Sequence, residues 1–165
     1  TLQILLTDGV EREELFNNPK IDSIMIGPMW ISAIGVPVIQ TYSDLKNSGE
    51  ISLIQNRTIR ESLVEVENGF NNLYLQQQDL ITVQQMRVDE IAIQLVDLAT
   101  IMQKTRLPQI TAGEKNDYRK LLENRGVRNT FVAKLELLRN AQNYQMRMLE
   151  TCNKLLALIE SEIED

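Results

Sequence analysis

The stretch Thr41–Leu63, TYSDLKNSGEISLIQNRTIRESL, decides the fold, because it ends one helix and starts a much longer one. Its first half predicts a short helix, and Gly49 suits the left-handed conformation that closes a helix. Asn56 then supplies a side chain that caps helix N-termini well. We therefore expect an irregular apolar segment before residue 56 and helix over nearly all of the chain after it.

Two long helices are predicted from apolar residues that alternate four and three apart. In the range 56–105 the spacing slips by four residues near Gln84, which we interpret as a stutter that locally unwinds the helix pair. The range 114–163 keeps the same spacing, with a possible break at Gly126. The first apolar seam contains Ile59, Leu63, Val66, Phe70, Leu73 and Leu80, and the second contains Phe131, Leu135, Leu138, Gln142, Gln145, Leu149, Cys152, Leu156, Ile159 and Ile163.

The turn between these helices lies between Pro108 and Gly113, so the helices should fold back on each other. Facing residues should then have numbers that sum to about 219. The predicted fold is mainly α: an antiparallel long-helix hairpin within a helical bundle, preceded by an irregular apolar N-terminal segment with short helices. We expect a single helical domain over 1–165, made of short helices and an apolar cap (1–55), a long helix (56–105) and a second long helix (114–163).

The apolar N-terminal segment IDSIMIGPMWISAIGVPVIQ, residues 21–40, contains the only Trp of the chain. Trp30 is the natural anchor of this segment, because a large aromatic ring buries much apolar surface. One interpretation is an interaction surface formed by Met29, Trp30 and Ile31. The other interpretation is that the segment covers the core of the bundle.

Polar residues interrupt both seams at levels that the hairpin would bring together. In the expected register Gln77 meets Gln142 and Tyr74 meets Gln145, with Tyr144 nearby. Such a layer could bind a small polar ligand between the helices. Alternatively, it could be a buried polar layer that fixes the pairing register at some cost in stability.

Composition restricts the possible functions. The chain has 165 residues, a formal net charge of −6, no His and a single Cys. The negative charge argues against nucleic-acid binding, and the weakly basic range 114–140 is interpreted as a solvated face. Without His, the carboxylates of Asp89, Glu90 and Asp97 lack the partners that di-metal helical bundles use, and Cys152 lacks a base that would activate it. We therefore predict no metal, no cofactor and no enzymatic activity.

The quoted stretch resembles the signature of a bacterial family catalogued as domain of unknown function 6090. Residues 123–159 are similar to the last helix of that family, and together the two regions cover about three quarters of the chain. The signature is structural in character and supplies no catalytic residues. The matching residues are Thr41, Leu45, Ser48, Gly49, Leu53, Ile54, Asn56, Arg60, Val127, Arg128, Asn129, Leu135, Leu137 and Leu138.

The resemblance implies a membrane-anchored protein with a basic cytoplasmic N-terminus, one hydrophobic helix and a helical domain on the extracytoplasmic, periplasmic side. This chain lacks the basic tail and the hydrophobic helix, so we expect it to be part of a longer protein whose only membrane contact is that anchor. The expected function is protein interaction or assembly, with an unknown protein partner and a homodimer as the expected state. The alternative is a ligand-sensing bundle that uses Tyr74, Gln77, Gln142 and Gln145.

Overall fold

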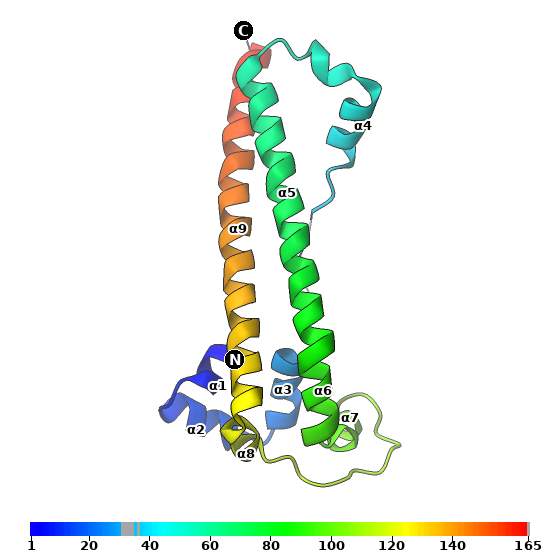
Figure 1. Ribbon diagram of the computed structural model, residues 1–165, viewed down its shortest axis with the longest axis vertical. Coiled ribbons are helices and arrows are strands. Elements are labelled where there is room, and N and C mark those ends of the chain that lie inside the picture. The colour runs from blue at the N-terminus through cyan, green and yellow to red at the C-terminus, as the bar shows by residue number, and fades with distance from the viewer. Residues whose placement is uncertain (31–34, 36, 165) are drawn as a thin grey trace. The chain divides into compact units, whose positions relative to one another are not determined.

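The protein is helical in this computed structural model, which describes residues 1–30, 35 and 37–164, with 92 and 93 described by their backbone only. No β-strand occurs among the described residues, so the predicted mainly α class is confirmed. The elements are α1 Leu2–Leu6, α2 Val10–Phe16, α3 Ile21–Trp30, α4 Gln40–Ser48, a 3-10 turn Glu50–Leu53, α5 Arg57–Val83, a π-helical turn Gln84–Val88, α6 Asp89–Leu95, α7 Leu98–Thr105, α8 Tyr118–Glu123 and α9 Arg125–Glu164 (Figure 1).

The chain divides into two compact units. Unit 1 comprises Thr1–Ala33 and Asp79–Leu138, and unit 2 comprises Ile34–Gln78 and Arg139–Asp165. In unit 1 the short helices α1, α2, α3, α7 and α8 gather around the π-helical turn, α6 and the first turns of α9 (Figure 1). Their apolar side chains form one core, made of Leu2, Leu5, Met25, Met29, Val88, Val96, Ile101, Tyr118, Leu121, Leu122, Val127 and Phe131.

The π-helical turn lies where the sequence pattern slips. Leu80, Gln84 and Val88 follow one another at intervals of four, and all three are buried. A regular α-helix would rotate such a series steadily off the buried face, since four residues exceed one turn of 3.6. The wider π turn absorbs the extra residue and keeps these side chains inside. The stutter predicted near Gln84 is therefore confirmed, and its structural form is a π turn at Gln84–Val88.

The long helix expected over 56–105 is interrupted, and that part of the prediction is wrong. Asp97 has an extended backbone conformation between α6 and α7, and its carboxylate accepts from the Thr100 N–H at 2.8 Å as the N-cap of α7. A second cap separates α8 from α9, because Asn124 Oδ1 accepts from the N–H groups of Gly126 and Val127. The break expected at Gly126 thus falls at Asn124, and the last helix begins at residue 125 rather than 114.

In unit 2 the beginning of α5 lies antiparallel to the end of α9 (Figure 1). Asn56 caps α5 as predicted, accepting from the Thr58 N–H at 2.9 Å, and it donates to Glu162 at 2.6 Å. Further along, a Cβ on Gly69 would lie 3.2 Å from Met148. These pairs have residue numbers that sum to 218 and 217, so the expected register is confirmed to within two residues.

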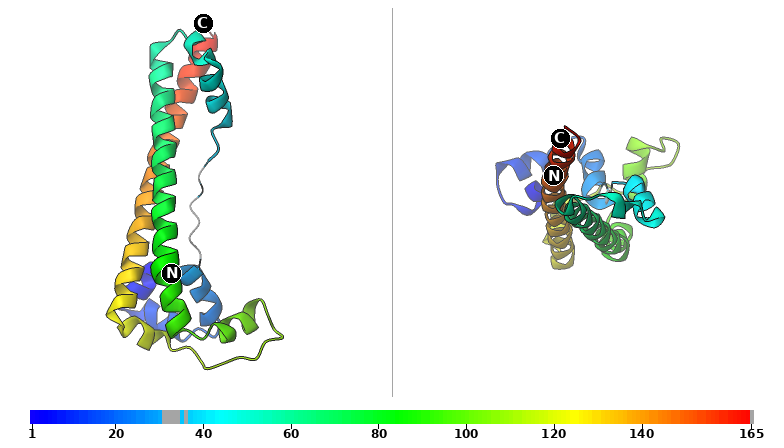
Figure 2. Two further views of the ribbon diagram at one scale, coloured as in Figure 1. Left: turned by 45° about the vertical axis from the view of Figure 1, so that its right-hand side comes forward. Right: turned by 90° about the horizontal axis from the view of Figure 1, so that it is seen from above.

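The helix α4 lies beside α5 in unit 2 (Figures 1 and 2). Its Lys46 ammonium pairs with Glu67 at 2.6 Å, and the Tyr42 hydroxyl donates to the same carboxylate at 3.1 Å. Gly49 closes α4 with φ of 78°, in the left-handed region that its sequence position predicted. The N-cap of α4 is Ile39, whose side chain makes no capping hydrogen bond.

Candidate functional site

A buried lysine closes the C-terminal end of α3 in unit 1. The last carbonyl groups of a helix have no partner within it and attract cations. Lys134 Nζ, from α9, donates to the Pro28 carbonyl at 2.6 Å and to Gln84 Oε1 at 2.6 Å. Gln84 Nε2 donates in turn to the Met29 carbonyl and to Asp89 at 2.7 Å. The two side chains therefore satisfy consecutive carbonyls of α3 and tie that helix to both long helices.

The Lys134 ammonium has no exposed surface, and this burial lowers the pKa of Lys134 to about 8, against a smaller opposing effect of the Asp89 charge. An amine with such a pKa is partly neutral near pH 8, which is the state a nucleophilic lysine needs. A pocket of about 410 Å³ has Lys134 among its lining residues, together with Leu2, Pro28, Leu135 and Leu138. Because Lys134 has no exposed surface and its ammonium already donates to Pro28 and Gln84, the geometry favours a structural role.

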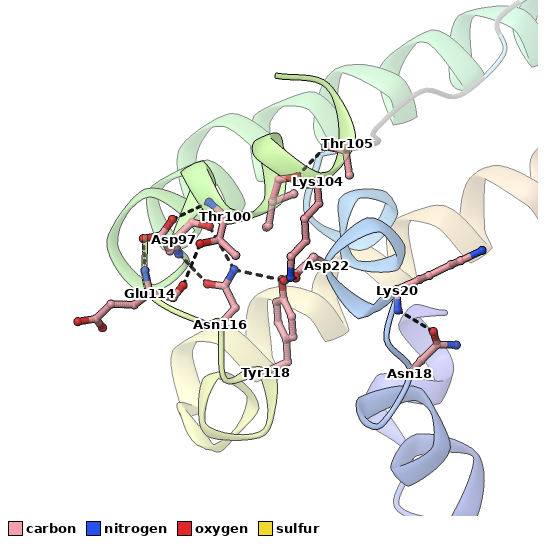
Figure 3. Close-up of polar contacts among 11 residues, drawn as sticks. Asn18, Lys20, Asp22, Asp97, Thr100, Lys104, Thr105, Glu114, Asn116 and Tyr118 are labelled. Atoms are coloured by element: carbon pink, nitrogen blue, oxygen red, sulfur yellow. Dashed lines mark hydrogen bonds and ion pairs between the residues drawn. The ribbon is translucent and has the colours of Figure 1, made fainter. Parts of the chain in front are cut away.

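A second buried polar cluster centres on Asp22 of α3 (Figure 3). Its carboxylate accepts from the Tyr118 hydroxyl at 2.7 Å, from Lys104 at 2.7 Å and, more weakly, from Asn116 at 3.4 Å. Burial alone would raise the pKa of Asp22, but these hydrogen bonds and the Lys104 charge outweigh it and hold the pKa below its ordinary value. Burial and the hydrogen bond to Asp22 raise the pKa of Tyr118. The cluster joins α3, α7 and α8 in unit 1.

Asp97 and Asn116 fasten the loop that connects α7 to α8 (Figure 3). Asn116 Oδ1 accepts from the Asp97 N–H at 2.7 Å, and Asn116 Nδ2 donates to the Asp97 carbonyl at 3.1 Å. The Asp97 carboxylate accepts from the Glu114 N–H at 2.9 Å. These backbone hydrogen bonds, that of Thr100 first, lower the pKa of Asp97. Every oxygen of this carboxylate is thus engaged within the protein, which leaves it no free role as a base.

Gly113 is required by the close approach of the loop to Asp97. A Cβ at this position would lie 1.8 Å from Asp97 Oδ2, whose position is fixed by the hydrogen bond from Glu114. We expect Gly113→Ala to displace this carboxylate, weaken the N-cap of α7 and lower Tm by roughly 5 °C in a thermal melt. Gly27→Ala is the matched control, because a Cβ there meets nothing within 4 Å and Ala favours helix. Equal Tm values for the two variants would contradict the requirement for glycine at position 113.

The glutamine–tyrosine layer expected between the long helices does not form as a buried layer in unit 2. Tyr74 is 54% exposed, and Gln142 and Gln145 are exposed as well, while Gln77 is half-buried. Gln145 donates to the Gly35 carbonyl at 3.0 Å rather than to another member of the layer. These side chains are therefore mostly exposed to solvent rather than buried between the helices.

The cause is a shift of one residue in half of the second seam. Among the seam residues that repeat every seven, Gln142, Leu149 and Leu156 are exposed, whereas the residues just before them are buried (Ala141 and Leu155) or half-buried (Met148). Lys134, Ala141 and Leu155 are buried, whereas Leu149, Leu156 and Ile163 are 64%, 54% and 78% exposed. The ammonium of Lys134 lies inside because it donates to the Pro28 carbonyl and to Gln84. The prediction followed hydrophobicity alone, and it therefore assigned the side of α9 that contains these leucines to the interior of the hairpin.

The residues proposed as an interaction surface are divided between the core and the region not described. Met29 has no exposed surface and belongs to the core of unit 1. Trp30 is half-buried and packs against that core, and Ile31 lies outside the described residues. The described part of this segment is helical through Trp30, with Pro28 inside α3. Because Met29 is fully buried, its side chain cannot contact a partner without local unfolding.

Two residues of the buried clusters, Lys134 and Asp22, were not identified from the sequence. A signal for Lys134 existed: Gln84 and Lys134 have numbers that sum to 218, so the hairpin register places them face to face. Asp22 had no such signal. No group of three or more His, Cys, Asp or Glu residues that could hold a metal ion occurs in the described part of the chain. Cys152 is a free thiol and half-buried.

Comparisons of the chain with known protein families, with curated proteins and with solved structures find no match. Across the described ranges, each helix is too short or too polar to cross a lipid bilayer. The class of the protein is therefore defined by its fold alone, as a mainly α protein with two long antiparallel helices. The resemblance to domain of unknown function 6090 stays a prediction.

Proposed function

We propose that this is a non-enzymatic helical domain that mediates protein interaction or assembly. The contact surface is the outer face of α9, the side of this helix on which Leu149, Leu156 and Ile163 lie. The carrying observation is a row of apolar side chains that unit 2 leaves in solvent: Leu149 and Leu156, seven residues apart and both more than half exposed, followed by Ile163 after another seven. Positions seven apart lie on one face of a helix. Large apolar side chains aligned in this way favour contact with another helix.

The polar groups described above already form hydrogen bonds within the protein, which supports a non-enzymatic function. Asp22, Asp97 and Lys134 all have their hydrogen-bonding capacity directed to other groups of the protein. A general base or nucleophile needs access to a substrate proton or carbonyl. The polar clusters of unit 1 instead hold its short helices together, which suits a scaffold that presents a surface.

Site-specific photo-crosslinking tests this proposal. A benzophenone amino acid replaces Leu149 or Leu156, and illumination of bacteria that naturally make the protein should give a covalent protein adduct from either position. The matched control is Leu75, an α5 leucine of unit 2 that is 59% exposed, close to the 64% of Leu149. Adducts at the two α9 positions and none at Leu75 are the expected result. Absence of adducts at both α9 positions would refute the function.

We also propose that the domain acts on the extracytoplasmic, periplasmic side of a bacterial membrane, held by an anchor outside this chain. This rests on the resemblance of residues 41–63 and 123–159 to domain of unknown function 6090. An alkaline phosphatase fusion to the full-length protein after residue 165 should be active, because that reporter needs an oxidising compartment to form its disulfides. An inactive but stable fusion would contradict the location.

A further inference from the structure

The outer face of α9 in unit 2 consists of two adjacent rows of side chains. One row repeats every seven residues through the exposed leucines, and the second, three residues before each member of the first, contains Met146, which is 64% exposed. Together they alternate three and four apart, which is the pattern of a helix face that packs on another helix. The outer face is defined as Arg139, Gln142, Met146, Leu149, Asn153, Leu156, Glu160 and Ile163.

Charge is separated along this face. Among the eight residues of the outer face, one is basic, Arg139, and one is acidic, Glu160. Arg139 and Glu160 belong to the same row, at opposite ends of the face. A parallel copy of α9 would place equal charges side by side, whereas an antiparallel copy places each arginine end against a glutamate end.

From this charge pattern we propose that the partner of the outer face is a second copy of the chain, packed antiparallel about a two-fold axis near Leu149. The inference rests on the proposed function and names its partner. Facing residues of the two copies have numbers that sum to about 299. Leu149 then meets Leu149, Gln142 meets Leu156, and Arg139 meets Glu160 at both ends of the interface. A two-fold contact of this kind is closed and yields a dimer rather than a filament.

Disulfide trapping tests both the partner and the direction. The native thiol is removed by Cys152→Ser, and single cysteines are placed at 142, 149 or 156 in the full chain. Under mild oxidation only Leu149→Cys should give a disulfide-linked dimer, since position 142 of one copy lies roughly 22 Å from position 142 of the other and a disulfide needs α-carbons within about 7 Å. Mixing the 142 and 156 cysteine variants should give the mixed disulfide.

The possible outcomes separate the inference from the proposed function. Equal disulfide formation at all three positions would indicate parallel helices and overturn the proposed direction. No disulfide at any position would overturn self-association. If photo-crosslinking then still gave adducts with another protein, the proposed function would stand without this inference. An adduct of twice the chain mass at Leu149 would support both.

Charge reversal provides a second measurement on the folded dimer. Arg139→Glu should weaken dimerisation roughly ten-fold at low salt, because it opposes Glu160 of the second copy. The double variant with Arg139→Glu and Glu160→Arg should restore it, as measured by sedimentation over a dilution series. In a parallel dimer residue 139 faces residue 139 of the second copy. The single reversal would then replace one pair of equal charges by another and have no effect. Circular dichroism of each variant checks that the helices are retained.

Discussion

Replacement of Asp22 by alanine is expected to lower the free energy of unfolding by about 2–4 kcal/mol. The carboxylate is 5% exposed and accepts from Tyr118, whose side chain is also buried. Without it the Tyr118 hydroxyl is left inside unit 1 with neither its acceptor nor water. Lys104 is less affected, because its side chain is half exposed and can be hydrated. Chemical denaturation followed by circular dichroism measures the loss.

A double-mutant cycle separates the cost of leaving the Tyr118 hydroxyl unpaired from the other costs of Asp22→Ala. In a Tyr118→Phe background no hydroxyl remains to be left unpaired, so the further replacement of Asp22 by alanine should cost clearly less than in the wild type. The remaining cost reports the Lys104 pair and the cavity. An identical cost in both backgrounds would show that the hydrogen bond between Tyr118 and Asp22 contributes nothing. Asp22→Asn, which retains an acceptor of nearly the same size, should fall between wild type and the alanine variant.

The features predicted correctly from the sequence depend on neighbours along the chain. Asn56 caps α5 and Gly49 closes α4 because a cap is made by backbone groups two or three residues away. The stutter at Gln84 was also visible, since it is a change in spacing. These signals need no knowledge of the partner helix.

The features that the sequence did not reveal depend on groups far away in the chain. The burial of Lys134 and Asp22 illustrates this. Lys134 donates to the Pro28 carbonyl, 106 residues away, and Asp22 accepts from the Tyr118 hydroxyl, 96 residues away. Hydrophobic spacing alone would assign Lys134 to the surface. It would also assign Leu149, rather than the helix face that contains Ala141, to the interior, because leucine is more apolar than alanine. Only the tertiary fold shows that the leucine row is exposed.

The same argument explains why the outer face of α9 was first assigned to the hairpin interior. The residues from 135 to 163 that repeat every seven have the composition of a helix seam, and the sequence offered one partner helix for it. In the fold Met148 lies against Gly69 of α5 instead, and Leu155, seven residues further along α9, is buried. A helix with apolar residues on two adjacent faces is suited to contact two helices at once, which is the physical basis of the proposed dimer.

The stability of the wild type should rise with pH relative to Lys134→Met by roughly 2–3 kcal/mol between pH 7 and pH 10. Lys134 has a pKa of about 8 in the folded protein and 10.5 as a free side chain. Between these values the unfolded chain binds more protons than the folded chain, so raising the pH favours folding. Below pH 8 both states are protonated, and the full cost of the buried charge opposes folding.

The comparison with Lys134→Met isolates this group, because the two proteins share all their other titratable groups. The nearby charge of Asp89 on α6 raises the pKa of Lys134 and so opposes part of the effect of burial. Urea denaturation at pH 7, 8, 9 and 10 provides the free energies for both proteins. Parallel curves would mean that Lys134 is hydrated in the folded state and does not cap α3 from within the core. Curves that converge or cross as the pH rises, with the wild type gaining stability, would place the uncharged amine against the Pro28 carbonyl.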